Sequence, residues 1–501
     1  MAAMQNAPSP TPLSPEHCYA ALLARDARFD GQWFVGVTST GVYCRPVCRV
    51  RPPKLANCRF YASAAQAEAA RFRPCLKCRP ELAPAAGQRW SVMDASQTLA
   101  RQAAALLDAG ATDSVEALAA RLGITGRHLR RIFAAEHGVT PLQYLQTRRL
   151  LLAKQLLVDS ALPVAAVAAA AGFRSLRRFN AVFAEQYRLK PSALRRGAPA
   201  VATACGEPAL RLAYRPPYAV EALLEFLAAR AIPGIERVDL AGRSISRSLR
   251  ICHEGRLQAG RIVVRFDAVQ PLVLLSPCAA VWGAVASLIP LVRRWLDLDA
   301  EPAAVDAHLG PLAASTPGLR LAGCTDRFEL AVRAVLGQQV TVAAARTLGA
   351  RFVQRFGAPL DPGQAEPGVD RLFPLPAQIA VTPLEAIAEL GIIRQRAEAL
   401  IALARAWPGL RYASGQGTPA EAIAELQALP GIGPWTAHYM LMRGWSWPDA
   451  FPPGDIVLRQ QLGGGRAAPL APQACVAAAE PLRPYRSYAV LQLWRAAAAR
   501  A

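Results

Sequence analysis

The stretch LPGIGPWTA, residues 429–437, places a Gly-x-Gly turn and a proline between two segments of helical pattern. A turn of this kind exposes backbone N–H groups at a helix N-terminus, where they can bind a DNA phosphate without a charged side chain. This helix-hairpin-helix pattern therefore predicts a DNA contact at Gly431 and Gly433. Taken alone, it predicts no chemistry.

A carboxylate follows the hairpin. In PPGDIVLR, residues 452–459, Asp455 comes after a Pro/Gly loop and begins the next helix. Hairpin, loop and aspartate in this order resemble the helix-hairpin-helix DNA glycosylase superfamily, and the resemblance implies that Asp455 is catalytic. Relatives with lyase activity carry a nucleophilic lysine where this chain has Trp435, so the resemblance implies a monofunctional enzyme.

Further stretches narrow this resemblance: FELAVRAVLGQQV at residues 328–340, RGW at 443–445 and PYRSYA at 484–489. They are similar to the AlkA-type enzymes, DNA-3-methyladenine glycosylase II. The resemblance implies an all-α glycosylase domain at residues 320–501. The preceding block, residues 207–310, mixes strand-like and helical runs and would be the family's N-terminal α+β domain.

The same resemblance implies a base pocket lined by three aromatic side chains, Trp435, Tyr439 and Trp494. Without the matched motif, each aromatic has about even odds of being a helix-core residue. The resemblance also implies a DNA-intercalating wedge at Gln339, where the family often has an apolar residue. Glutamine can fill the gap left by a flipped base, but it inserts less apolar surface.

Charge is unevenly distributed along the 501 residues. The chain has 57 Lys and Arg against 36 Asp and Glu, and residues 1–200 hold 27 of the basic and 12 of the acidic residues. Such an excess predicts a polyanionic partner, with nucleic acid or an anionic membrane as candidates. Residues 1–15 are polar and Pro-rich and predict a flexible tail rather than a signal peptide. Residues 268–292 are uncharged but contain three prolines, which favours a buried strand and helix over a membrane span. We expect a cytoplasmic protein without a membrane partner.

Eleven cysteines, an odd number, argue against a disulfide framework. Four of them form two close pairs, Cys44-x3-Cys48 and Cys75-x2-Cys78, and each pair can grip one side of a tetrahedral ion. Four thiolates favour zinc. An inert zinc knuckle is the simplest interpretation, but the surrounding basic residues also suit a nucleophilic zinc-bound thiolate.

The stretches TGVYCRP (40–46), FY (60–61) and FRPC (72–75) resemble the zinc domain of Ada-type alkylation-response proteins, which predicts such a domain at residues 16–84. In that family the first cysteine is both a zinc ligand and the acceptor of methyl groups from DNA methylphosphotriesters. The resemblance therefore implies one Zn²⁺ per chain, structural and catalytic, with Cys44 as acceptor. Cys58 is interpreted as a buried or surface thiol. The family's Pro-Cys-His-Arg-type methyltransferase motif is missing from the sequence, so O6-methylguanine repair is not predicted.

Two helix-turn-helix patterns lie about fifty residues apart. Residues 114–123 and 164–171 predict short helices ended by glycine, and residues 126–137 and 175–187 predict basic helices that could enter a major groove. The block at residues 88–196 resembles an AraC-type DNA-binding domain, although a solvated basic bundle is the simpler alternative. The candidate DNA-facing side chains are Arg130, Arg131, Arg177 and Arg178.

Together these patterns predict a multidomain, mainly α chain with a small zinc-bound α/β domain, a tandem helix-turn-helix, an α+β sheet domain and a helix-hairpin-helix glycosylase. The leading hypothesis is a bacterial-type alkylation sensor, transcription regulator and glycosylase in one chain, monomeric, with alkylated and promoter DNA and RNA polymerase as partners. One alternative is a regulator whose glycosylase half is degenerate. Another is a glycosylase for oxidised or mismatched bases.

Overall fold

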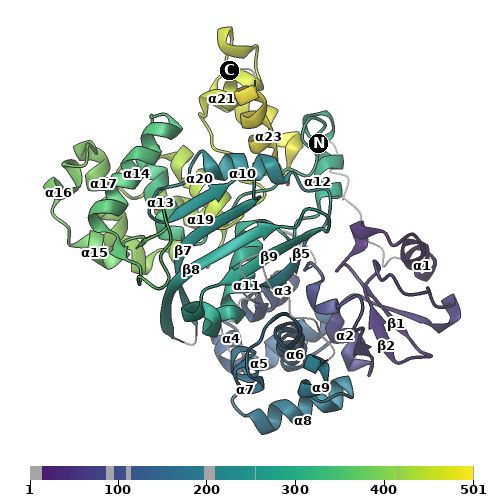
Figure 1. The fold of residues 1–501 in the computed structure, drawn as a ribbon. Coiled ribbons are helices and arrows are strands. Elements are labelled where there is room, and N and C mark those ends of the chain that lie inside the picture. Colours follow the sequence, from purple (N-terminus) through teal and green to yellow (C-terminus); the bar gives the residue numbers. More distant parts are fainter. Residues whose placement is uncertain are drawn as a thin grey trace. The chain divides into compact units, whose positions relative to one another are not determined.

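The computed structural model describes residues 14–85, 95–108, 114–196, 209–253, 255–415 and 417–499. The chain forms two compact units, Met1–Arg215 and Pro216–Ala501 (Figure 1). Of the predicted tail at residues 1–15, positions 1–13 lie outside the described residues, and Pro15 already begins α1 (Pro15–Ala24). No helix in the described ranges is both long and apolar enough to cross a bilayer.

The first unit begins with a small four-stranded sheet in the order β3-β1-β2-β4. Its strands are β1 (Phe34–Val37), β2 (Val42–Cys44), β3 (Cys58–Tyr61) and β4 (Arg73–Pro74), accompanied by α1 and α2 (Ala64–Ala69). β1 is antiparallel to β2 and β3, whereas β2 and β4 are parallel, with Tyr43 opposite Pro74. Because cysteines follow directly after Tyr43 and Pro74, this register brings the two cysteine pairs together.

The helical part of this unit contains both predicted helix-turn-helix patterns. Its helices are α3 (Ala95–Asp108), α4 (Val115–Arg121), α5 (Gly126–His137), α6 (Pro141–Asp159), α7 (Val164–Ala170), α8 (Leu176–Tyr187) and α9 (Pro191–Arg196). Gly123 and Gly172 adopt positive φ after α4 and α7, where glycine avoids the steric cost of a side chain. Phe133 and Phe183 occupy matching buried positions in α5 and α8. The fifty-residue repeat in the sequence thus becomes a repeat of packing.

Two buried polar networks join the small sheet to the helices of the same unit. The Glu68 carboxylate accepts hydrogen bonds from Tyr43 Oη at 3.0 Å and Thr147 Oγ1 at 2.9 Å. Glu81 contacts Lys154 at 2.5 Å and Arg79 at 2.9 Å, and Arg79 also reaches Asp159 at 2.7 Å. β5 (Leu210–Ala213) lies against the same long helix, since Gln155 donates to the Arg211 carbonyl at 2.8 Å. α6 is therefore fixed to the cysteine-bearing loops by charge as well as by packing.

The second unit begins with α10 (Val220–Ala228) and antiparallel strands in the order β9-β8-β7-β6. These strands are β6 (Glu236–Asp239), β7 (Ser244–His253), β8 (Arg256–Phe266) and β9 (Leu272–Pro277). The uncharged stretch at residues 268–292 becomes β9, a 3-10 turn (Ala279–Ala284) and the start of α11 (Val285–Trp295). The expectation of a buried strand followed by a helix is confirmed. α12 (Pro302–Leu309) leads into the helical part.

Helices dominate the remainder of the second unit. They are α13 (Arg327–Leu336), α14 (Val342–Phe356), α15 (Pro376–Ala380), α16 (Leu384–Ala388), α17 (Arg394–Ala406), α18 (Arg411–Ser414), α19 (Pro419–Gln427), α20 (Pro434–Gly444), α21 (Ile456–Gln461), α22 (Pro472–Ala478) and α23 (Arg486–Ala499). Phe328, Phe352, Leu400 and Met440 pack in one buried core among α13, α14, α17 and α20. This core places the hairpin between α19 and α20 beside the corner between α13 and α14.

Residues 359–368 connect a short strand pair, β10 (Ala358–Pro359) and β11 (Arg371–Leu372). Leu360 in this segment is buried, and Glu366 forms ion pairs with Arg237 and Arg261. The composition of this segment favours a loop, and contacts with residues far away in the sequence hold that loop in place.

Candidate metal centre and base pocket

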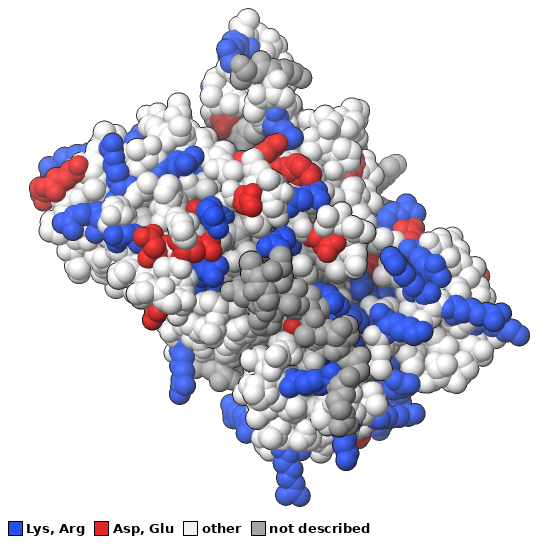
Figure 2. Space-filling view, in the orientation of Figure 1, with Lys and Arg blue, Asp and Glu red and all other residues white. Residues whose placement is uncertain are grey.

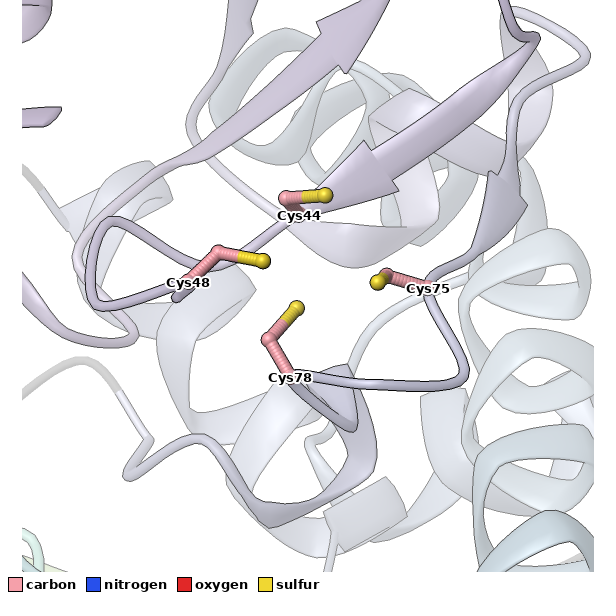
Figure 3. Close-up of side chains that lie close together, drawn as sticks. All are labelled: Cys44, Cys48, Cys75 and Cys78. Atoms are coloured by element: carbon pink, nitrogen blue, oxygen red, sulfur yellow. The ribbon is translucent and has the colours of Figure 1, made fainter. Parts of the chain in front are cut away.

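The four predicted metal ligands form one cluster. The sulfur atoms of Cys44, Cys48, Cys75 and Cys78 all lie within 4.8 Å of one another and point toward a common centre (Figure 3). Cys44 ends β2 and Cys75 follows β4, where the Cys75 N–H donates to the Tyr43 carbonyl at 3.0 Å. Three of the side chains are buried and Cys78 is partly exposed. Four converging sulfurs fit a tetrahedral structural Zn²⁺.

Hydrogen bonding distinguishes the four sulfurs. The Arg45 N–H donates to Cys78 Sγ at 3.4 Å. The contact with the Cys44 thiol is the largest cause that lowers the pKa values of Cys48 and Cys75, and backbone N–H groups of Val50 and Cys78 add a smaller lowering; the pKa of Cys48 is about 7. Contacts with the thiols of Cys48 and Cys75 instead raise the pKa of Cys44. The four thiols compete for protons, which a divalent cation would replace.

The basic residues expected around the thiol site do not all present their charge to solvent. The Arg45 guanidinium is buried, donates to the Cys78 carbonyl at 3.1 Å and is paired with Asp30. Its charge is therefore compensated inside the protein. Exposed basic side chains elsewhere in this part of the chain are Arg25, Arg28, Arg49, Arg51, Lys54, Arg59, Arg71 and Lys77. On the face drawn in Figure 2, Lys and Arg predominate over the first unit, whereas acidic groups are mixed with basic ones on the second.

The four helix-turn-helix arginines are exposed on α5 and α8. Arg130 reaches back to Glu116 of α4 at 2.6 Å, with both side chains largely in solvent, and Arg131 contacts His128 at 3.3 Å. Thr125 and Ser175 cap the N-termini of the two helices. The side chains are accessible to a phosphate backbone or to base edges, as groove-binding helices require.

In the predicted base pocket, the Asp455 carboxylate accepts hydrogen bonds from side chains of two other helices. It caps α21, with Oδ1 accepting the Leu458 N–H at 3.0 Å. Its Oδ2 accepts the Trp435 indole N–H at 2.8 Å, and its Oδ1 accepts that of Trp494 at 3.3 Å. Side chains from α20, α21 and α23 therefore converge on one carboxylate. All three side chains are half-buried, so the group remains open to a ligand.

Tyr439 completes the aromatic group. Its ring stacks on Trp435 with centroids 5.1 Å apart and planes 9° apart, and lies 6.3 Å from the Trp494 ring. The Arg443 guanidinium donates to the Tyr439 phenol oxygen at 3.0 Å. Burial raises the pKa of Tyr439, but the positive charges of Arg443 and Arg230 outweigh it and lower the pKa overall. Sequence reasoning missed Arg443, although positions 435, 439 and 443 follow helical spacing along one face.

The proposed wedge and the hairpin lie on neighbouring turns. Gln339 is exposed and adopts a left-handed φ of 53° between α13 and α14. Gly431 has φ 76°, and a β-carbon there would stand 2.7 Å from the Ala399 methyl group, so the turn requires glycine. Gly433 begins α20 as its N-cap. Gln338, which no sequence pattern marked as functional, joins these two turns through its side chain.

Known proteins match the chain along most of its length. Four family models match consecutive segments: the metal binding domain of Ada (residues 17–81), a helix-turn-helix domain (118–197), the AlkA N-terminal domain (209–326) and the HhH-GPD superfamily base excision DNA repair protein (332–464). A Mycobacterium tuberculosis (strain ATCC 25618 / H37Rv) protein named "Probable bifunctional transcriptional activator/DNA repair enzyme AlkA" is 37% identical over 500 residues, 96% of each chain. The chain belongs to this AlkA family of bifunctional proteins.

Two Escherichia coli (strain K12) proteins each match one part of this AlkA-family chain. "DNA-3-methyladenine glycosylase 2" is 37% identical over 284 residues, 56% of this chain and 95% of that protein. "Bifunctional transcriptional activator/DNA repair enzyme Ada" is 37% identical over 139 residues, 28% of this chain and 37% of that protein. The resemblances to Ada-type, AraC-type and AlkA-type proteins are confirmed. The Ada model spans all four clustered cysteines, and the HhH-GPD model includes Asp455.

Proposed function

We propose that the second unit removes alkylated bases of the 3-methyladenine type from double-stranded DNA, with Asp455 as the catalytic residue. The observation that carries this proposal is the carboxylate held by two indole N–H groups beside stacked aromatic rings. The two indole N–H groups orient the Asp455 carboxylate, which is only half-buried and can therefore face a flipped nucleotide. The alternative hypothesis, a degenerate glycosylase half, does not account for two indole N–H groups that donate to one carboxylate.

Alkylation at N3 or N7 makes a purine cationic and therefore a good leaving group. The C1′–N bond breaks with its electron pair leaving on the base, and the sugar develops oxocarbenium character. Asp455 stabilises that positive charge and accepts a proton from the water that forms the new C1′–O bond. Trp435 supplies no amine nucleophile, so the product is an intact abasic site.

Selectivity arises in this proposal from the aromatic group. Trp435, Tyr439 and Trp494 favour a cationic ring by cation–π attraction, worth about 0.5–2 kcal/mol per contact. An aromatic surface accepts many base shapes, so the pocket selects electron-deficient bases rather than one hydrogen-bonding pattern. A glycosylase for oxidised or mismatched bases would instead need polar groups matched to each base edge.

Asp455→Asn tests the glycosylase proposal because it keeps size and removes charge. We expect base release from methylated duplex to fall by about a thousandfold or more, while duplex binding changes little. Asp361→Asn is the matched control, since Asp361 is an exposed aspartate of the same unit. Full release by Asp455→Asn, or strand cleavage without added base, would overturn the proposal.

We further propose that Cys44 accepts a methyl group from DNA methylphosphotriesters. Its sulfur attacks the methyl carbon, an S–CH₃ bond forms, the O–CH₃ bond breaks, and the electron pair stays on the phosphate oxygen as the normal diester. Zn²⁺ held by Cys44, Cys48, Cys75 and Cys78 would keep the sulfurs as thiolates, which gives the metal a catalytic as well as a structural role. Support comes from the four sulfurs that lie within 4.8 Å of one another and from the match of residues 17–81 to the metal binding domain of Ada.

Mass spectrometry of the protein after exposure to methylphosphotriester DNA tests this second proposal. We expect one methyl group on Cys44 and none in Cys44→Ala. Cys58→Ala is the matched control, because Cys58 is a buried thiol of the same domain outside the cluster. Methyl uptake by Cys44→Ala would overturn the assignment.

We also propose methylation-dependent binding to promoter DNA, and the tandem helix-turn-helix supports this DNA contact. In this proposal the protein acts in the cytoplasm as a monomer that contacts RNA polymerase. Four thiolates with one Zn²⁺ carry two net negative charges, and methylation leaves one. Less repulsion of phosphates strengthens binding through Arg130, Arg131, Arg177 and Arg178 in successive major grooves. Footprinting of one asymmetric site before and after methylation tests this; a strict palindrome would contradict it.

A further inference from the structure

Gln338 connects three elements of the helical part of the second unit. Its side-chain Nε2 donates to the Gly431 carbonyl at 2.8 Å and to Thr436 Oγ1 at 3.0 Å. The backbone carbonyl of Gln338 accepts a hydrogen bond from the Arg396 guanidinium of α17. One residue therefore fastens the α13–α14 corner to the hairpin turn, to the first turn of α20 and to α17.

The two turns that Gln338 joins have different tasks in DNA. The hairpin glycines would hold a phosphate, whereas Gln339, the next residue along the chain, would enter the stack where the target base has left. The α13–α14 corner is short, because α13 ends at Leu336 and Thr341 already caps α14. Its left-handed residue is exposed, so local packing alone does not fix its direction.

We propose that Gln338 is a positioning residue that sets the distance between the phosphate grip at Gly431 and the wedge at Gln339. This inference rests on the proposed glycosylase function. With the two turns locked together, gripping the phosphate places the wedge at the base stack in the same step. Both side-chain contacts of Gln338 use its amide N–H donors, which a carboxylate or a thioether cannot supply.

The experiment compares Gln338→Glu and Gln338→Met with the wild-type protein. Glutamate keeps the length and loses the donors, and methionine removes polarity at similar volume. Gln378→Met is the matched control, because Gln378 also donates to a backbone carbonyl in this part of the unit, that of Phe356 at 2.9 Å, away from the hairpin. Single-turnover release of N7-methylguanine is measured from a duplex and from a bulge in which the base is unpaired. A 2-aminopurine beside the lesion reports unstacking by its fluorescence.

Loss of two neutral hydrogen bonds should slow release from the duplex about tenfold in both Gln338 variants and reduce the fluorescence rise. Release from the bulge should change by only about twofold, since an unpaired base costs little to extrude. Gln378→Met should behave as wild type on both substrates. Equal losses on duplex and bulge, or an unchanged duplex rate, would overturn the role of Gln338. Absence of release by the wild-type protein would instead overturn the proposed glycosylase.

Discussion

The thiol site and the base pocket both surround a negatively charged group with N–H donors, but they are assembled differently. The thiol site takes its ligands from residues 44–78, and one strand pairing, β2 with β4, is enough to bring them together. The base pocket takes its side chains from residues 435–494 on three helices. Its geometry therefore depends on packing across the whole helical core.

This difference predicts how each site responds to damage. The thiol site is assembled by one strand pairing, so it depends on its small sheet and on the cation that holds the four sulfurs together. A pocket closed by three helices depends on the helices' packing and on single hydrogen bonds to the carboxylate. Perturbing the metal should affect one site alone, and perturbing indole N–H groups should affect only the other.

Removal of zinc should give the largest effect. Structural zinc contributes on the order of 10 kcal/mol in small domains, so a strong chelator should unfold the small sheet of the first unit and abolish methyl uptake. Base release should stay unchanged, because Asp455 and its partners lie in the other compact unit. Zinc content, methyl uptake and base release are measured on one chelated sample. Loss of base release that returns with added zinc would show that the two sites are not independent.

The sequence predicted these two sites by different routes. Paired cysteines a few residues apart indicate a metal site directly, because the spacing reflects the ligand geometry. The pocket could be assigned only by resemblance, since nothing in the order of Trp435, Asp455 and Trp494 shows that two indoles will donate to one carboxylate. Arg443 and Gln338 were missed for the same reason: their roles arise from contacts across helices. Arg45 was misjudged because its partner Asp30 lies in a different loop.

Buried Glu68 should make the stability of the first unit, which contains the thiol site, depend on pH. Burial raises the pKa of Glu68 from its ordinary value of 4.5 to about 8, and hydrogen bonds from Thr147, Tyr43 and Tyr187 offset only part of that rise. Between about pH 4.5 and 8 the folded protein therefore keeps a proton that the unfolded chain has lost. The free energy of unfolding should fall as pH rises through this window, by up to about 1.4 kcal/mol per pH unit.

Glu68→Gln should remove this slope and leave the first unit more stable than wild type at pH 8, with little difference near pH 4.5. Urea unfolding at several pH values, followed by a signal from the first unit, measures it. Glu185→Gln, at an exposed glutamate of α8, is the control and should keep the wild-type slope. An unchanged slope in Glu68→Gln would show that Glu68 is already ionised in the fold.

Trp435→Phe and Trp494→Phe test the hydrogen bonds that hold the Asp455 carboxylate. Each keeps an aromatic ring and removes one N–H donor to Asp455. A hydrogen bond to a charged acceptor is worth about 1.5–3 kcal/mol, so Trp435→Phe should slow base release by about 10- to 100-fold. Trp494→Phe should cost less, because its contact is 3.3 Å against 2.8 Å for Trp435. Single-turnover rates on a methylated duplex measure both, and a larger loss for Trp494→Phe would contradict the order.

Substitutions of the two hairpin glycines should affect stability differently but weaken DNA binding alike. Gly431→Ala puts a β-carbon 2.7 Å from the Ala399 methyl group at a residue with φ 76°, so we expect a loss of about 1–3 kcal/mol in the free energy of unfolding of the second unit. At Gly433 a β-carbon would meet no heavy atom within 4 Å, and the backbone has φ −88°. Gly433→Ala should therefore leave stability within about 0.5 kcal/mol of wild type. A methyl group at the exposed N-terminus of α20 would still stand where a phosphate must approach, so duplex affinity should fall in both variants. Urea unfolding and duplex binding separate these effects, and Gly433→Ala with normal affinity would show that this turn does not contact the phosphate.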